Sequence, residues 1–252
     1  MHLKNRTRVI VWIAAAILSS AVSPASAQPA AGAPDSRWSV EFGIGLDNSI
    51  SGNINSSAIG TINNQTTVIT KNTYEAVYGT GLHLRFGGGY MLNDNSEVRA
   101  TFSFQSLDAD LTPMGQIGSS NLYGQYSDYQ SLSLDVGLRQ YGDLSPKVRA
   151  YGEALIGLGF VDKTDVTLVA PGAGLTQKAT DFYDQTAALS LGVNAGILVQ
   201  GNEHFGYFGQ LGFRRMGGMD EIDDLAGTGL ETINDSSSRW TFPFIVGIRA
   251  RF

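Results

Sequence analysis

Residues 239–252, RWTFPFIVGIRARF, decide the fold class of this 252-residue chain. Every even position from Trp240 to Phe252 is apolar, whereas the odd positions include Arg249 and Arg251. A period of two places these two sets of side chains on opposite faces of a β-strand. The stretch therefore predicts a strand with one apolar and one polar face, and it leaves open which face meets solvent or lipid.

The same alternation recurs in seven earlier segments of the chain. In residues 97–105, for example, the even positions are apolar and the odd positions include Glu97 and Arg99. Eight segments of about ten residues with this alternation are typical of a transmembrane β-barrel. The segments lie at 37–47, 78–90, 97–105, 130–140, 148–160, 187–199, 205–213 and 239–252.

The connections between these segments alternate strictly between long and short. Barrels of bacterial outer membranes have short periplasmic turns and longer extracellular loops. The alternation therefore predicts an all-β fold, an eight-stranded antiparallel up-and-down transmembrane β-barrel over residues 37–252. The long connections are 48–77, 106–129, 162–185 and 216–237, and the short ones are 92–96, 142–147 and 201–204.

The N-terminal residues carry the features of a secretory signal peptide. They combine a basic start, an apolar run over residues 9–18 and the small-residue sequence ASA at 25–27. This order of features is typical of a cleaved signal, and the apolar run is shorter than the roughly 20 residues of a membrane helix. We therefore expect a signal peptide at 1–27 and a flexible lead-in at 28–36.

The composition excludes several classes of function. The chain has 17 basic and 23 acidic residues, and the signal peptide holds three of the basic ones, which leaves 14 − 23 = −9 for the mature chain. A charge of this sign disfavours nucleic-acid binding. Because the chain has no cysteine, disulfides, thiolate catalysis and cysteine-bound metals are excluded. We expect no cofactor and no metal site.

Two kinds of eight-stranded barrel fit the alternation. A soluble barrel points its apolar face inward, whereas a membrane barrel points it at lipid. The apolar faces are nearly free of charge and are flanked by aromatic residues, as expected at the two membrane interfaces, and this favours the membrane barrel. These aromatics are Trp38, Tyr90, Tyr141, Phe205 and Phe252 toward one rim, and Tyr78, Phe104, Tyr129, Phe160 and Trp240 toward the other.

A signal peptide, eight alternating strands and a terminal strand ending in phenylalanine resemble the small outer-membrane β-barrels of Gram-negative bacteria, of the OmpA-like, opacity and porin-family surface-antigen type. The resemblance implies a location in the outer membrane, in contact with its lipid. It also implies that FIVGIRARF is the signal read by the barrel-assembly machinery, through Phe244, Val246, Ile248 and Phe252. The peptidoglycan-binding domain that follows the barrel in OmpA is not expected here.

The polar face of the strands carries charges of both signs, which point into the barrel. Buried charges must be paired or solvated, so we expect a network of salt bridges and water that fills the lumen. Because arginines outnumber acids, a narrow gated path or an anion site is the alternative. The predicted network comprises Glu41, His83, Arg85, Glu97, Arg99, Asp135, Arg139, Arg149, Glu153, Arg214, Arg249 and Arg251.

The strand pairing can be predicted at three places. Closure of the last strand against the first puts Glu41 beside Arg249. The hairpin through residues 142–147 puts Arg139 beside Arg149. Pro243 removes one hydrogen bond from its strand, so we expect a local irregularity there. Apolar Leu155, Phe208 and Ile245 share the inward parity, which favours a plugged interior.

The loops are the expected working surface, because loops on a rigid scaffold commonly carry recognition. Alternation in residues 66–80 suggests that part of the first loop forms a hairpin. We expect a monomeric structural and surface protein with an unknown extracellular ligand and no catalysis. One alternative is a narrow channel or conduit for small solutes, including hydrophobic ones. The second is a lipid-modifying enzyme, for which the mature chain offers only His83 and His204 as a base.

Overall fold

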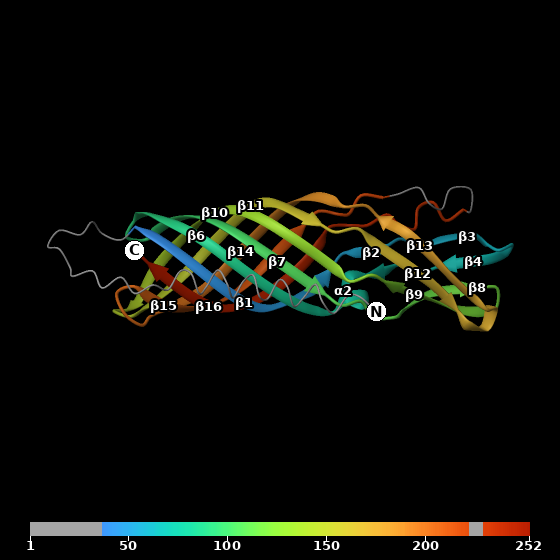
Figure 1. Cartoon of the computed structure of the whole chain (residues 1–252), viewed down its shortest axis with the longest axis horizontal. Helices are drawn as coiled ribbons and strands as arrows, with labels where there is room; N and C mark the ends of the chain where they lie inside the picture. The colour runs from blue at the N-terminus through green and yellow to red at the C-terminus, as the bar shows by residue number, and fades with distance from the viewer. Residues whose placement is uncertain (1–36, 222–228) are drawn as a thin grey trace. The chain divides into compact units, whose positions relative to one another are not determined.

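The computed structural model describes residues 37–221 and 229–252, so the predicted signal peptide (1–27) and lead-in (28–36) lie outside the described residues. Eight long strands close into an antiparallel barrel in which each strand pairs with its neighbours in chain order (Figure 1). The predicted eight-stranded up-and-down barrel is confirmed. Its strands are β1 (Trp38–Ser51), β6 (Thr80–Asn93), β7 (Ser96–Leu107), β10 (Tyr129–Ser145), β11 (Val148–Val161), β14 (Thr186–Gln200), β15 (Phe205–Met216) and β16 (Arg239–Arg251).

The two ends of the barrel differ. The short turns and the C-terminus lie at one end, which we call the turn end (Figure 1). There Trp38 and Phe252 exchange two backbone hydrogen bonds, of 3.2 and 3.1 Å, that complete closure of the barrel. The long connections leave from the opposite end, which we call the loop end.

Pro243 is accommodated without a bulge. On one side it lies opposite Asp47 in a regular β1–β16 register. On the other side, the β15–β16 pairing stops at residue 211 and resumes at residue 214 in the same register. A Cβ atom on Gly212 would lie 3.0 Å from the proline ring, so a residue without a side chain faces Pro243. The predicted irregularity is therefore a gap in the ladder.

The outward positions of the barrel strands carry large apolar side chains. Leu134, Val193 and Phe244 are examples, with 58 %, 56 % and 45 % of their surface exposed. A soluble monomer seldom exposes a contiguous apolar patch larger than a few hundred Å². The charged residues of the barrel strands lie mainly at inward positions, and this confirms the predicted orientation of the two faces.

The aromatic residues predicted at the two rims fall into two groups. Tyr78, Tyr129 and Tyr141 are buried, so their prediction as rim residues was wrong. Tyr129 and Tyr141 have the same parity in β10 as inward-facing Arg139, and Tyr78 belongs to a short helix instead of a strand. The exposed or half-buried members are Trp38, Tyr90, Phe205 and Phe252 at the turn end and Phe104, Phe160 and Trp240 at the loop end.

The long connections fold into a second structure, which we call the cap. The cap comprises six strands in one antiparallel sheet, with the order β13-β12-β9-β8-β4-β3, together with smaller elements and residues 217–221 and 229–238 (Figure 1). The sheet strands are β3 (Ala58–Ile62), β4 (Gln65–Ile69), β8 (Thr112–Ile117), β9 (Ser120–Tyr126), β12 (Thr164–Ala170) and β13 (Leu175–Tyr183). The smaller elements are β2 (Asn53–Asn55), β5 (Asn72–Thr73), α2 (Tyr74–Tyr78) and η1 (Pro171–Ala173).

The first loop contains a hairpin, but it joins residues 58–62 to 65–69, and only its second strand overlaps the predicted range of 66–80. Strands β3 and β4 are joined by Asn63 and Asn64, whose φ angles of 50° and 60° suit a two-residue hairpin turn. The prediction of a strand farther along was wrong, because residues 74–78 form helix α2. The hydroxyl of Thr73 caps this helix by accepting a hydrogen bond from the amide of Ala76 at 3.3 Å. No helix within the described residues is long and apolar enough to cross a membrane.

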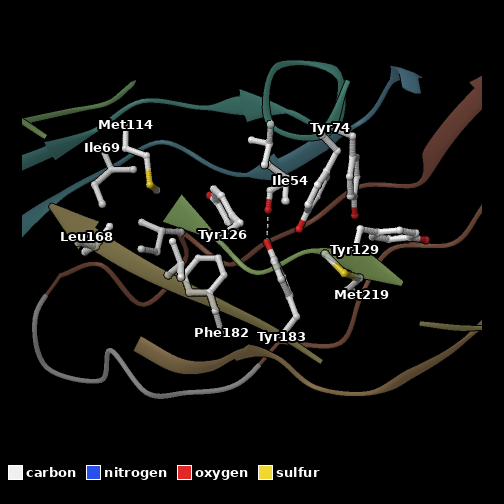
Figure 2. Packing of buried hydrophobic residues seen from close by; sticks show 14 of the residues in the cluster. Ile54, Ile69, Tyr74, Met114, Tyr126, Tyr129, Leu168, Phe182, Tyr183 and Met219 are labelled. Carbon is white, nitrogen blue, oxygen red and sulfur yellow. Dashed lines mark hydrogen bonds between the residues drawn. The ribbon is translucent and has the colours of Figure 1, made fainter. Parts of the chain in front are cut away.

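The cap has a hydrophobic core of its own, which we call the cap core (Figure 2). Side chains from all four long connections meet in it; Ile54, Met114, Phe182 and Leu230 are 0–2 % exposed. The core also contains several tyrosines, and the hydroxyl of one of them, Tyr183, donates to the carbonyl oxygen of Ile54 (Figure 2). The cap is therefore a packed unit rather than a set of separate loops.

Candidate functional site

The turn-end half of the lumen holds a cluster of ion pairs that we call the lower network. Its members come from six barrel strands, and each is at most 4 % exposed. Charged groups this deeply buried require partners, and each of these has at least one partner within 3.1 Å. The lower network consists of Glu41, Glu97, Glu153, Arg85, Arg99, Arg139 and Arg249.

Glu41 lies at the centre of the lower network. Its Oε1 contacts Arg139 at 2.6 Å and Arg249 at 3.1 Å. Its Oε2 contacts Arg99 at 2.7 Å and the second guanidinium nitrogen of Arg139 at 3.2 Å. Glu41 also pairs with Arg249 in the β1–β16 register, which confirms the predicted neighbour. One carboxylate thus joins three arginines from three different strands.

Glu97 completes one side of the lower network. It accepts from Arg249 at 2.8 Å and from Arg99 at 3.4 Å. The hydroxyl groups of Ser39 and Tyr141 donate to the same carboxylate, each at 2.5 Å. Side-chain hydroxyls therefore satisfy the lone pairs that the arginines leave unused.

Glu153 completes the other side. It contacts Arg85 at 2.7 Å, Arg99 at 3.0 Å and Arg139 at 3.1 Å, and it accepts from the side-chain amide of Asn194 at 2.7 Å. The three glutamates therefore share four arginines, and no arginine of the lower network depends on a single partner except Arg85.

The predicted pairing of Arg139 with Arg149 was wrong. Arg139 lies opposite Glu153, because β10 extends to residue 145 and the turn is tighter and later than the sequence suggested. This register brings opposite charges together across the two strands. Arg149 lies at the turn-end rim, where it contacts Asp143 at 2.6 Å. Arg251 is also at this rim, and neither arginine belongs to the lower network.

A second group of charges, the upper network, lies nearer the loop end. Arg214 contacts Asp135 at 2.6 Å, and Arg239 lies 3.6 Å from Asp47. Arg239 also donates to Ser49 at 3.1 Å. The sequence prediction included Arg214 and Asp135 but missed Asp47 and Arg239. Their parity was the available signal, since both occupy inward positions at the loop ends of β1 and β16.

Apolar side chains fill much of the remaining lumen. Phe208 and Ile245 are 4 % and 1 % exposed, as the predicted plugged interior requires. Leu155 points inward beside Gly137, although it is only half-buried. At the turn end, Tyr151 stacks against the guanidinium of Arg139, with 4.0 Å between the guanidinium carbon and the ring centroid. The lumen is thus packed at several levels.

The two histidines have no arrangement that suggests catalysis. His83 is 2 % exposed, and its Nδ1 lies 3.5 Å from the side-chain nitrogen of Gln105. A histidine that acts as a base is normally oriented by a carboxylate or carbonyl acceptor. His204 lies in the last turn, where its Nδ1 is 3.3 Å from the carbonyl oxygen of Arg251. Within the described residues, no group of three or more acidic or histidine side chains is placed to hold a metal.

The cap differs from the lumen in charge. Residues 50–79, 108–128, 162–185 and 217–238 contain 14 acidic and three basic residues, a net charge of −11. The side chain of Asp108, for example, is exposed. The cap is therefore the most acidic part of the chain.

The C-terminal strand keeps its predicted alternation. Phe244, Val246, Ile248 and Phe252 all point outward, with 40–61 % of their surface exposed. The same strand directs Arg249 into the lower network. One strand thus contributes both to the apolar exterior and to the ion pairs of the lumen.

No family model and no curated protein matches this chain. Among solved structures, the chain is similar to neisserial surface protein A, with 13 % identity, a TM-score of 0.46 and coverage of 85 % of this chain and 97 % of that one. It is also similar to OprG from Pseudomonas aeruginosa (12 %, 0.45, 88 % and 98 %) and to Ail of Yersinia pestis (13 %, 0.38, 86 % and 99 %). Ail has also been crystallised with the heparin analogue sucrose octasulfate.

Proposed function

We propose that the protein spans the outer membrane of a Gram-negative cell as a barrel with a closed lumen, and that it presents the cap outside the cell as a recognition surface without enzymatic turnover. The observation that carries this proposal is the cap core. Loops that only join strands need no shared core, whereas the cap core packs side chains from all four long connections together.

The exterior of the barrel supports the membrane location. Large apolar side chains occupy the outward positions of all eight strands, and burial in lipid removes them from water at a gain of roughly 25 cal/mol per Å². Trp38 and Phe252 mark the turn-end interface, and Phe160 and Trp240 mark the opposite one. Closure of β1 against β16 leaves no unpaired edge in this region.

The interior supports a closed lumen. The lower network reaches across the lumen, because Glu41 of β1 contacts Arg139 of β10, a strand three places away in the ring of eight. Above it, Phe208 and Ile245 fill further space. A solute would have to displace buried ion pairs whose members would then lack partners. This favours the structural role over the channel or conduit.

The cap supports a role in recognition. A surface that is already ordered loses little conformational entropy when it binds a partner. Its charge of −11 favours a cationic protein or peptide, since complementary charge accelerates association and selects partners. The same charge disfavours a sulfated polyanion of the kind crystallised with Ail.

Assembly would use the C-terminal strand. Its outward residues Phe244, Val246, Ile248 and Phe252 provide the apolar pattern that we assign to the barrel-assembly machinery. Because β16 closes the barrel against β1, its edge is unpaired until closure. We expect the assembly machinery to recognise the strand at that stage. Substitution of Phe252 by serine should therefore lower the amount of folded protein in the outer membrane.

The proposal can be tested with the mature chain refolded into vesicles. Binding of a fluorescent oligolysine and of heparin would be compared at low and high salt. We expect oligolysine to bind and heparin not to bind. Combined neutralisation of the exposed Asp108, Asp110 and Asp220 should weaken oligolysine binding about 3- to 150-fold, at roughly 0.2–1 kcal/mol for each exposed charge.

The matched control neutralises two exposed acids at the turn end, Asp94 and Glu203, and should leave binding unchanged. Preferential binding of heparin, or an equal loss in both variants, would contradict the assignment of the cap. Steady single-channel currents in planar bilayers would instead favour the conduit. Alteration of lipid A on expression, abolished by His83→Ala, would favour the enzyme.

A further inference from the structure

The buried charges of the lumen do not balance. The upper network pairs two arginines with two aspartates, whereas the lower network combines four arginines with three glutamates. Arginine does not lose its proton in proteins, so the excess positive charge stays. An uncompensated buried charge is very costly, and the packed barrel interior gives it little water. The excess therefore calls for a counterion.

A cavity lies where the two networks meet. It offers about 20 Å³ to the centre of a water-sized sphere, which is room for one or two water molecules or one small ion. Its wall includes Arg85 from the lower network and Arg214 from the upper one, together with His83. Two arginines of different networks thus line the same small space.

The hydrogen bonds around His83 define which of its nitrogens carries the proton. Gln105 Oε1 accepts from Ser131 at 3.1 Å and from Arg239 at 3.1 Å, so the other side-chain atom of Gln105 is its NH₂ group. This NH₂ group faces His83 Nδ1 at 3.5 Å and makes Nδ1 the acceptor. The proton of the neutral ring is then on Nε2, a buried atom without a protein partner.

Two more donors line the cavity. Gln210 accepts from the hydroxyl of Tyr151 through Oε1 at 3.0 Å, so its Nε2 is a donor. Ser190 Oγ accepts from Arg214 at 2.7 and 3.1 Å, which leaves its hydroxyl proton to donate elsewhere. The polar groups that can turn to the cavity are therefore mostly donors, as an anion requires.

One carboxylate also belongs to the wall. Asp135 Oδ2 is bound to Arg214 at 2.6 Å, and its charge is matched by that pair. Its Oδ1 lies toward β11, 2.7 Å from the place that a Cβ atom on Gly157 would occupy. Arg85 has no comparable private partner, because Glu153 is shared with two further arginines. The net charge next to the cavity stays positive.

We propose that this cavity binds one small monovalent anion of the size of chloride, held by Arg85, Arg214 and the Nε2–H group of His83. The anion neutralises the excess charge of the lower network and satisfies the unpartnered donor of His83. It is a structural ligand between the two networks. The site is independent of the role proposed for the cap, and it would stand if that role proved wrong.

Thermal unfolding of the refolded mature chain in detergent tests the site. Melting temperatures (Tm) would be compared in sodium chloride and in sodium gluconate at equal ionic strength, because gluconate is too large for the cavity. Chloride at about five times its dissociation constant lowers the unfolding constant about sixfold, which raises Tm by about 2–4 °C. We expect this difference to saturate with chloride, and bromide in crystals should give an anomalous peak in the cavity.

Two variants localise the effect. Arg85→Gln removes one positive charge from the cavity wall and should abolish the difference between chloride and gluconate. Arg149→Gln, at the turn-end rim, is the matched control and should preserve it. Equal Tm in both salts, or an unchanged chloride effect in Arg85→Gln, would overturn the proposal. If Arg85→Gln does not fold, the absence of a bromide peak from wild-type crystals would overturn it.

Discussion

Neutralisation of Glu41 is the sharpest test of the lower network. Glu41 makes four contacts of 2.6–3.2 Å with three arginines, and it is 3 % exposed. In Glu41→Gln the charge excess of the lower network rises from one to two. The new NH₂ group would also face guanidinium donors. Breaking a buried ion pair by removing one partner costs about 3–5 kcal/mol.

Each arginine that contacts Glu41 keeps another glutamate. Arg99 and Arg139 retain Glu153, and Arg249 retains Glu97. The loss is therefore expected near the lower end of that range, about 3 kcal/mol, which is an increase of roughly 150-fold in the unfolding constant. The variant should still fold if the free energy of unfolding of the wild-type barrel exceeds this loss.

Reversible urea unfolding in detergent micelles would measure this loss, followed by the fluorescence of Trp38 and Trp240. Glu203→Gln, at an exposed position of the last turn, is the control and should change stability by less than about 0.5 kcal/mol. A loss below about 1 kcal/mol in Glu41→Gln, similar to the control, would refute the central role of Glu41. It would mean that water, and not arginine, balances this carboxylate.

Two further predictions concern barrel closure and the cap. A Cβ atom on Gly45 would lie 1.9 Å from the carbonyl oxygen of Phe244, so Gly45→Ala should prevent β1 from closing on β16. The variant should then lose the gel shift between unboiled and boiled samples. Gly209→Ala is the control and should keep the shift, because no atom lies within 4 Å of the added Cβ. Normal heat-modifiability of Gly45→Ala would contradict this register. Burial raises the pKa of four cap tyrosines above 10. As the pH rises above 10, these tyrosines therefore lose their protons in the unfolded chain before they lose them in the folded one. The free energy of unfolding should fall by about 1.4 kcal/mol per pH unit for each tyrosine. Tyrosinate absorbance at 295 nm that rises near pH 10 before the cap unfolds would show that these side chains are accessible. These tyrosines are Tyr74, Tyr78, Tyr126 and Tyr183.

The sequence predicted the barrel because alternate residues of a strand face two different environments and differ in polarity accordingly. The parity of Glu41, Glu97 and Glu153 placed all three in the lumen, and the structure brings them into one network. Closure of the last strand against the first also placed Glu41 beside Arg249, since Trp38 lies level with Phe252 at the turn end. Local periodicity was sufficient for these features.

Register depended on turns that the sequence describes poorly. A turn placed two residues too early put Arg139 beside Arg149, although the strand assignments themselves were right. A turn displaced by two residues moves the cross-strand partner by four positions, here from Arg149 to Glu153, without changing its face, so parity gives no warning. The mutual attraction of Arg139 and Glu153 is a contact between strands and becomes visible only when the register is known.

The sequence by itself determined the number of barrel strands, the alternation of long and short connections between them, and the inward position of the charged residues of the lower network, because these follow from a local period of two. Tertiary structure decided the rest. The cap sheet joins segments as far apart as Ala58 and Tyr183, and its short strands carry too few residues for periodicity to reveal them. The excess of arginine was visible in the sequence, but only folding placed Arg85, Arg214 and His83 around one cavity, since they come from strands that meet across the lumen.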